Sequence, residues 1–596
     1  MARSAATSLT VTLAALATAL GGCSTRTNVA ATANTSSLYT HVYVTVQAVW
    51  FNSSASAGPD DSGWRQFPLS TPVTVDLVAY SGGNFANLAT DLRLGPGTYS
   101  QVRLIPVDAS TPLTASAQTL GATYNMEADY VDSSGVTHQL PLELLNPDKG
   151  LGIQGSLKVP IGSISPALVA VSSQGSTSTP TTGTTTLATA ASRTGSQTTT
   201  AEFGVAFDAL RDLAAFTYGG AYGVLFSSHV SANDLSGSGG IQGQLTLTSL
   251  TGLTSPNGTL GLEVSAQSLS ADGTRHFVVA RAPVASDGSF TLYPLGANSS
   301  NNTSYDVVIH GPGIATMIIR SVLIPPTGHG VSTTGTSTTG TAANPDTSPI
   351  TPANLVSIGT LTPRAASTYT ANIATAAGAP LPAGAEVDFC QTLPSSGEVP
   401  YVIEAAPIDP FNQVLLPAQA LSSGTVDSGT YVSSGATITV VSAAPAEGSG
   451  TYQVAASAPL YADGPLGLTV SAPTAAGVTA AGPVTLAPLA LASGSSTASV
   501  TAVVLPATAG KYDHGELMLS QNGQLIASTP LDAALAAGGG PVLLAGIPGG
   551  TSDSLYYLTV RAWNSSDPAG TLTRQWYPGA VDLRSALSAS AQLTID

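Results

Sequence analysis

Alternation with a period of two is the feature that most constrains the fold of this chain. From 41 to 50 the sequence HVYVTVQAVW places three valines on one side of an extended backbone, and Tyr43 and Thr45 on the other. Successive side chains of a strand point to opposite faces, so this segment predicts a half-buried strand. Similar segments recur along the chain between turn residues. Asn522-Gly523 is the clearest turn, because the type I′ turn of a β-hairpin favours this pair; it predicts a hairpin over 516–528.

The scarcity of charged residues excludes long amphipathic helices as the main building elements. Only 9% of the 596 residues are charged, whereas 62 are Gly and 40 are Pro. A surface helix needs charged helix formers on its solvent face, and this chain lacks them. We therefore predict an all-β fold of several consecutive antiparallel β-sandwich domains behind a lipoprotein signal peptide.

The N-terminal segment has the pattern of a bacterial lipoprotein signal. Arg3 precedes an apolar run over 9–20, which is shorter than the roughly 20 residues that span a bilayer. The sequence Leu20-Gly21-Gly22-Cys23 follows as a lipobox, so we predict a signal peptide over 1–22 and lipidation of Cys23. The alternatives are an ordinary signal peptide that contains a cysteine and a short transmembrane anchor. Residues 23–37 are polar and are predicted to form a flexible tether.

Charge and location narrow the expected partners. The net charge is −17 with only 17 Lys and Arg, which argues against nucleic-acid binding because that needs a basic surface. Ser24 follows the cysteine, and by resemblance to lipoprotein sorting this favours the outer membrane of a Gram-negative envelope. We expect attachment to the membrane through the N-terminal lipid, in a periplasmic or surface-facing position. Envelope polysaccharide or another surface protein are the expected further partners.

The first third of the chain resembles a known family. The segments VYVTVQAVWF, GWRQFPLSTPVTVDLVAY, LGPGTYSQVRLIPVDA and GIQGSLKVPIG follow one another in the order of the DUF4382 domain of bacterial envelope lipoproteins. The resemblance covers residues 38–235 and implies an all-β domain and an envelope location, but no reaction. A Ser/Thr-rich insertion over 172–199 departs from the family pattern and is predicted to be disordered.

The remaining chain divides into three further predicted units. Residues 239–326, with turns at Asp272-Gly273 and Asp287-Gly288, resemble carboxypeptidase-regulatory or transthyretin-like sandwiches. Asp-Gly between short strands predicts a hairpin at each turn. A Ser/Thr/Gly/Pro linker is predicted over 327–354. It is followed by a β-sandwich over 355–480 and an immunoglobulin-like β-sandwich over 481–596.

A search for catalytic chemistry nominates no residue. The seven histidines form no HExxH motif or i, i+4 pair, no GxSxG is present, and no cofactor or metal is expected. The glycines of 150–155 match GxGxxG, but a strand follows, which favours a turn over a nucleotide site. Glu127 and Asp129 share a strand face, although the neighbouring polar residues indicate a solvated loop. Asp60-Asp61-Ser62-Gly63 is interpreted as a solvated turn, because it lacks the alternating acidic residues of a calcium loop.

Two residue types carry the remaining binding hypotheses. Trp576 and Tyr577 are the candidates for stacking on a sugar, with Trp50, Trp64 and Trp563 as further rings. The alternative, which we favour, is that these rings close the ends of sandwiches, since large aromatic side chains usually supply burial. Cys390 is predicted to be an inert, partly covered thiol, with an intermolecular disulfide as the alternative.

Three functions remain open from the sequence. The first is a lipid-anchored, non-catalytic envelope protein with a structural, adhesion or display role. The second is a carbohydrate-binding surface lipoprotein. The third, favoured least, is an enzyme whose site is built from scattered residues.

Overall fold

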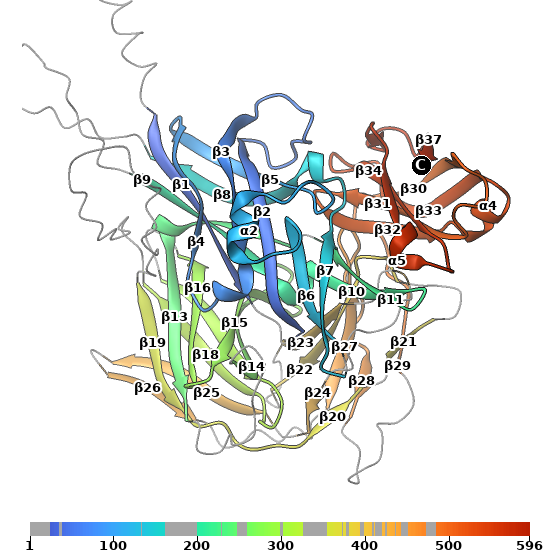
Figure 1. Cartoon of the computed structure of the whole chain (residues 1–596). Coiled ribbons are helices and arrows are strands. Elements are labelled where there is room, and N and C mark those ends of the chain that lie inside the picture. Colours follow the sequence, from blue (N-terminus) through green and yellow to red (C-terminus); the bar gives the residue numbers. More distant parts are fainter. Residues whose placement is uncertain are drawn as a thin grey trace, which may run out of the picture.

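A computed structural model gives the structure of the chain, which is built almost entirely of strands (Figure 1). It describes residues 24–34, 38–132, 134–160, 200–227, 229–246, 259–297, 302–325, 354–371, 373–376, 381–393, 399–407, 411, 420–423, 426–434, 437–442, 451–471 and 484–596. The predicted all-β fold is confirmed. Most ladders are antiparallel, and six pairs among the described strands are parallel. Parallel neighbours need long crossovers, so strands distant in sequence share a sheet.

The first sandwich packs two sheets around one apolar core. One sheet has the order β12-β9-β1-β4, formed by Ser231–Asp234, Thr200–Asp208, Thr25–Asn34 and Ala86–Leu94. The other has the order β10-β11-β7-β6-β2-β5-β8, with β3 beside β2. Its strands are Leu213–Tyr218, Ala221–Phe226, Thr137–Glu143, Met126–Val131, Tyr39–Asn52, Gly97–Pro106 and Leu151–Val159, and β3 is Arg65–Asp76. Short helices connect them: η1 (Leu77–Ala79), α2 (Ala115–Leu120), η2 (Pro147–Lys149), α3 (Ala209–Asp212) and η3 (Leu235–Gly237).

Strand β1 corrects the prediction of a flexible tether over 23–37. Its residues Arg26 to Asn34 pair in parallel with β9, and its other edge pairs with β4. Val29 and Ala31 are fully buried in the core of the first sandwich. The segment TRTNVAATAN gives little apolar signal, because small alanine and threonine side chains fill a closely packed interface. The predicted disordered insertion over 172–199 and the predicted signal peptide lie outside the described residues.

The second sandwich recruits strands from beyond its predicted boundary. Its sheets have the orders β16-β13-β19 and β15-β14-β17-β18-β25-β26. The strands are β13 (Ser238–Leu245), β14 (Thr259–Leu269), β15 (His276–Ala285), β16 (Ser289–Gly296), β17 (Thr303–His310), β18 (Met317–Ile324), β19 (Leu355–Leu361), β25 (Asp427–Ser434) and β26 (Thr437–Ser442). Because β19, β25 and β26 come from the predicted third unit, the boundary predicted at 355 is wrong. Of the predicted linker 327–354, only Asn354 lies within the described residues.

The two Asp-Gly turns of this unit have different outcomes. Asp272-Gly273 joins β14 to β15, which pair directly, so the predicted hairpin is confirmed. Asp287-Gly288 joins β15 to β16, which lie in different sheets, so the predicted hairpin is wrong there. Local turn chemistry is the same in both places, and only the packing of the two sheets distinguishes them.

The third sandwich is built from short strands, and its strand β23 packs against β15 and β17 of the second sandwich. Its main sheet has the order β23-β22-β27-β28, formed by Tyr401–Pro407, Glu386–Gln391, Tyr452–Ser457 and Leu468–Val470. Two short pairs complete it: β20 (Thr368–Thr370) with β24 (Ala420–Ser422), and β21 (Ile373–Thr375) with β29 (Val484–Leu486). Because β29 pairs with β21, the third unit extends past the boundary predicted at 480.

The fourth sandwich lies beside the first, red against blue in Figure 1. Its sheets have the orders β33-β30-β37 and β32-β31-β34-β35, with β36 beside β34. The elements are β30 (Ser496–Pro506), β31 (His514–Gln521), β32 (Gln524–Pro530), α4 (Asp532–Ala536), β33 (Gly540–Gly549), β34 (Leu555–Trp563), α5 (Pro568–Thr571), β35 (Thr573–Trp576), β36 (Val581–Asp582) and β37 (Ser588–Ile595). The hairpin predicted at Asn522-Gly523 is confirmed, with φ of 51° and 87° at the two turn residues.

Candidate functional site

A buried ion pair joins the first and fourth sandwiches. Arg561 on β34 has no exposed side-chain surface, and its Nε lies 3.1 Å from Oε2 of Glu143 on β7. The ring of Tyr218 lies 3.9 Å from the guanidinium carbon, and Trp563 lies 4.7 Å from it. A desolvated cation over aromatic faces, paired with a carboxylate, fixes the relative position of the two sheets.

A second contact between these sandwiches uses the glycine motif of residues 150–155. Arg103 Nη2 donates a hydrogen bond of 2.9 Å to Oδ1 of Asn522 in the turn between β31 and β32. A Cβ on Gly152 would lie 2.6 Å from that oxygen, so only glycine leaves room for the contact. Only Gly150 precedes β8, and the other residues of the motif lie within this strand, so the predicted turn is wrong beyond Gly150. The chain continues as a strand and not as a helix. Gly152 therefore permits close approach between two domains.

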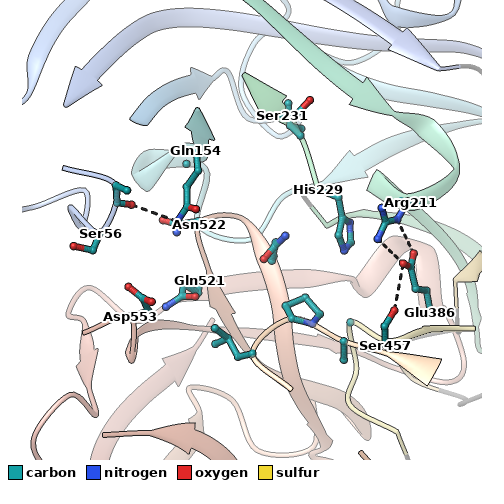
Figure 2. Close-up of a pocket in the computed structure, with 18 of the residues that line it drawn as sticks. Ser56, Gln154, Arg211, His229, Ser231, Glu386, Ser457, Gln521, Asn522 and Asp553 are labelled. Carbon is teal, nitrogen blue, oxygen red and sulfur yellow. Dashed lines mark hydrogen bonds and ion pairs between the residues drawn. The ribbon is translucent and has the colours of Figure 1, made fainter. Parts of the chain in front are cut away.

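A bidentate ion pair joins the first and third sandwiches. Arg211 on α3 donates from Nε to Glu386 Oε2 at 2.6 Å and from Nη2 to Oε1 (Figure 2). Ser457 on β27 also donates to Glu386, at 3.4 Å. Burial alone would raise the pKa of Glu386, but the guanidinium of Arg211 holds it below its usual range. Glu386 is therefore an ionised carboxylate whose role is to hold two domains together.

The second sandwich is held to the others by a similar set of charges. Arg275, just before β15, pairs with Asp463 and lies 3.9 Å from Asp388 of the third sandwich. His310 on β17 lies 3.3 Å from Glu263 of its own sheet and 3.5 Å from Glu404 on β23. In a chain with so few charged residues, these groups are concentrated where domains meet.

A cavity of about 630 Å³ opens at this junction, and all four sandwiches contribute to its walls. Arg211, His229, Glu386 and Ser457 gather at one end of the view in Figure 2, and Gln521 lies toward the other. A volume of this size is typical of small-molecule sites. The cavity is the candidate functional site.

Burial shifts the pKa values of titratable groups in and beside the cavity. Burial lowers the pKa of His229 to about 4, so its imidazole is neutral near pH 7. Burial raises the pKa of Asp212 to about 8, and its carboxyl group accepts a hydrogen bond of 2.7 Å from the backbone N–H of Asp208. Burial likewise raises the pKa of Asp388 to about 7. Within the described part of the chain, no cluster of three or more His, Cys, Asp or Glu side chains has the arrangement of a metal site.

The residues predicted from the sequence lie elsewhere. Leu20, Gly21, Gly22 and Cys23 are outside the described residues. Trp576 ends β35 and is half-buried, and Tyr577 packs against the core of the fourth sandwich. Neither lines the cavity.

The other aromatic rings serve packing. Trp563 is 8% exposed and lies against Arg561, while Trp50 and Trp64 lie 6.0 Å apart by their ring centroids. Trp64 donates from Nε1 to the carbonyl oxygen of Gly58 at 2.8 Å. This agrees with the interpretation that the tryptophans supply burial.

Two predictions about polar residues have different outcomes. Cys390 is fully buried and burial raises its pKa well above the usual value, which fits an inert thiol. The solvated loop predicted around Glu127 and Asp129 is wrong, because both side chains are buried on β6. Glu127 Oε2 accepts hydrogen bonds from the backbone N–H groups of Thr123 and Tyr124 at 2.5 and 2.7 Å, which supply partners that the sequence pattern does not reveal.

Sequence reasoning missed the cavity because its residues come from distant segments. One signal was available in β22, where Glu386 and Asp388 interrupt apolar residues in EVDFCQ. All six residues of this strand are buried, so both faces are covered. Carboxylates inside an otherwise apolar strand indicate a buried ion-pair network.

Comparison with known proteins identifies the first sandwich. The family model of DUF4382, described as a domain of unknown function, matches residues 25–223. The match begins at β1, thirteen residues before the predicted start at 38, and it ends at 223, before the predicted end at 235. No curated protein matches the chain.

The solved structures to which the chain is similar include proteins of Bacillus and Corynebacterium. The major pilin subunit BcpA of Bacillus cereus has 12% identity and a TM-score of 0.12, over 60% of this chain and 99% of the pilin. The TIE protein of Bacillus anthracis has 8% identity and a TM-score of 0.12, over 93% of this chain and 69% of the TIE protein. The major pilin SpaA of Corynebacterium diphtheriae has 11% identity and a TM-score of 0.12, over 60% of this chain and 100% of SpaA. Similarities of this size carry no functional argument, so function is argued from the chain's own residues.

Proposed function

We propose that the chain is a lipid-anchored, non-catalytic protein of the bacterial cell envelope with a structural, adhesion or display role. The observation that carries this proposal is the pairing of buried charges across domain boundaries, as in Arg561–Glu143 and Arg211–Glu386. A catalytic acid or base needs a proton that it can exchange with a substrate. Here the charged groups bind one another across domain boundaries, so their role is structural.

The anchor is the second part of the proposal. Cys23 follows a lipobox, and strand β1 begins at Thr25, so acylation would hold the first sandwich close to the membrane. A single acyl chain binds membranes only marginally, whereas a diacylglyceryl group with an N-acyl chain gives a stable anchor. Among the described residues, no helix combines the length and apolar character needed to cross a bilayer. The proposed location is the outer membrane. We also propose that the second sandwich is transthyretin-like.

Two experiments test the proposal. Metabolic labelling with a fatty-acid analogue is expected to mark the wild-type chain and to be lost in Cys23→Ser; labelling that persists in the variant would contradict lipid anchoring. Cells that display the chain are expected to attach to a surface in greater numbers than cells that lack it. Turnover of an envelope substrate by the purified chain, lost in Glu386→Gln, would contradict the non-catalytic role.

A further inference from the structure

The cavity at the junction has no net formal charge. Its ionisable lining consists of four arginines and four carboxylates, in addition to histidines. Most of these charges are paired within the protein: Arg211 with Glu386, Arg275 with Asp463, and Arg584 with Asp582. The arginines of the lining lie within salt-bridge distance of carboxylates, so an anionic ligand would find no uncompensated cation to offset its desolvation. The lining therefore favours a neutral ligand.

Several polar groups of the lining make no hydrogen bond to the described part of the protein. Gln521 and Gln524 flank the type I′ turn of the β31–β32 hairpin and pair directly across it, which places both side chains on the same face. Within the described part of the chain, neither amide has a protein hydrogen bond. The Nη1 group of Arg275 is buried and also lacks a hydrogen-bond acceptor among these residues. These groups include both donors and acceptors.

A carboxylate and an aromatic ring complete the lining. Asp553 precedes β34 and has no cation within salt-bridge distance among the described residues, so its oxygens can accept hydrogen bonds. Phe277 on the edge strand β15 is 46% exposed, an unusual position for a phenyl ring. A hydroxyl group both donates and accepts hydrogen bonds, and a sugar ring also has an apolar C–H face.

We propose that this cavity binds a short, neutral saccharide, held by the Gln521–Gln524 amide pair and Asp553 and packed against Phe277. The site combines residues of the second and fourth sandwiches, so it exists only when these domains are packed together. It does not depend on lipidation of Cys23, and binding and anchoring can therefore fail separately. It replaces Trp576 and Tyr577 as the candidate sugar-contacting residues.

Isothermal titration of the purified full-length chain in detergent tests this site. The probes are neutral trisaccharides of glucose, xylose and N-acetylglucosamine, an acidic trisaccharide of galacturonate and a neutral tripeptide. We expect binding of at least one neutral trisaccharide, and a loss of affinity of about tenfold or more in Gln521→Ala/Gln524→Ala, because two hydrogen bonds are removed. Phe277→Ala, which leaves the hairpin intact, is expected to weaken the same binding independently.

Matched variants make the outcome decisive. Gln592→Ala removes an exposed glutamine of the same sandwich outside the cavity, and it is expected to bind as the wild type does. Thermal unfolding shows whether each variant is folded before it is titrated. Binding of none of the neutral trisaccharides, binding of only the acidic trisaccharide or the peptide, or binding lost in Trp576→Ala and kept in the cavity variants would each overturn the proposal.

Discussion

Arg561 illustrates how single residues hold this protein together. Its guanidinium is completely buried, so its charge is tolerated only because Glu143 and several aromatic faces surround it. Removing one partner of a buried pair leaves the other charge without compensation, which is more costly than losing the attraction itself.

We predict that Arg561→Met lowers the free energy of unfolding by about 3–5 kcal/mol, because Glu143 remains buried without a cation. Chemical denaturation followed by tryptophan fluorescence measures the change. Arg584→Met is the matched control: Arg584 and its partner Asp582 are both exposed, so its loss should cost about 0–1 kcal/mol. Equal effects of the two substitutions would show that the buried pair does not join the domains.

A second residue-scale prediction concerns pH. Burial raises the pKa of Glu127 to about 7, above its value of about 4.3 in an unfolded chain. The folded state then binds this proton more tightly than the unfolded state. The contribution to stability is complete below about pH 4 and is lost as the pH rises toward 7.

Glu127→Gln should remove this pH dependence. The glutamine amide reproduces the protonated acid, and its carbonyl oxygen can still accept from the N–H groups of Thr123 and Tyr124. Denaturation experiments measure the free energy of unfolding of both proteins. The value for the variant minus the value for the wild type is expected to increase as the pH rises from 5 to 8. Asp148→Asn changes an exposed carboxylate and should leave the pH profile unaltered. If the stability of Glu127→Gln depends on pH as that of the wild type does, the raised pKa of Glu127 is contradicted.

At the scale of elements, local sequence patterns predicted where the strands lie better than they predicted which strands pair with one another. The alternation over 41–50 lies within β2, and Asn522-Gly523 forms the expected turn. The pairing of β19 with β13 and of β25 with β18 depends on long crossovers, which no local pattern encodes. The cavity was unpredictable for the same reason, because Gln521 and Phe277 line it together only after the sandwiches pack.

Strand β1 gives the element-scale prediction. As an inner strand with partners on both sides, it should protect its backbone amides from hydrogen exchange about as strongly as β9 does. Exchange measured by mass spectrometry on peptides that cover 25–34 and 200–208 makes the comparison. Exchange of the first peptide within seconds, as in a flexible tether, would contradict the pairing.

At the scale of the whole molecule, the junction replaces the expectation of separate, flexibly linked sandwiches. Every sandwich contributes charged residues to it, and His310 of the second sandwich lies 3.5 Å from Glu404 of the third. Interfaces between domains of one chain are often small and polar and allow relative motion. Here bidentate and aromatic-covered ion pairs restrict that motion, and the cavity keeps its shape only under this restriction.

Small-angle X-ray scattering of the purified chain tests this packing most directly. A single compact body of this length has a radius of gyration of about 25 Å. We predict a value close to this, somewhat enlarged by the segments outside the described residues, and a distance distribution with one maximum. A much larger radius, with a distribution that extends over several domain lengths, would contradict the account.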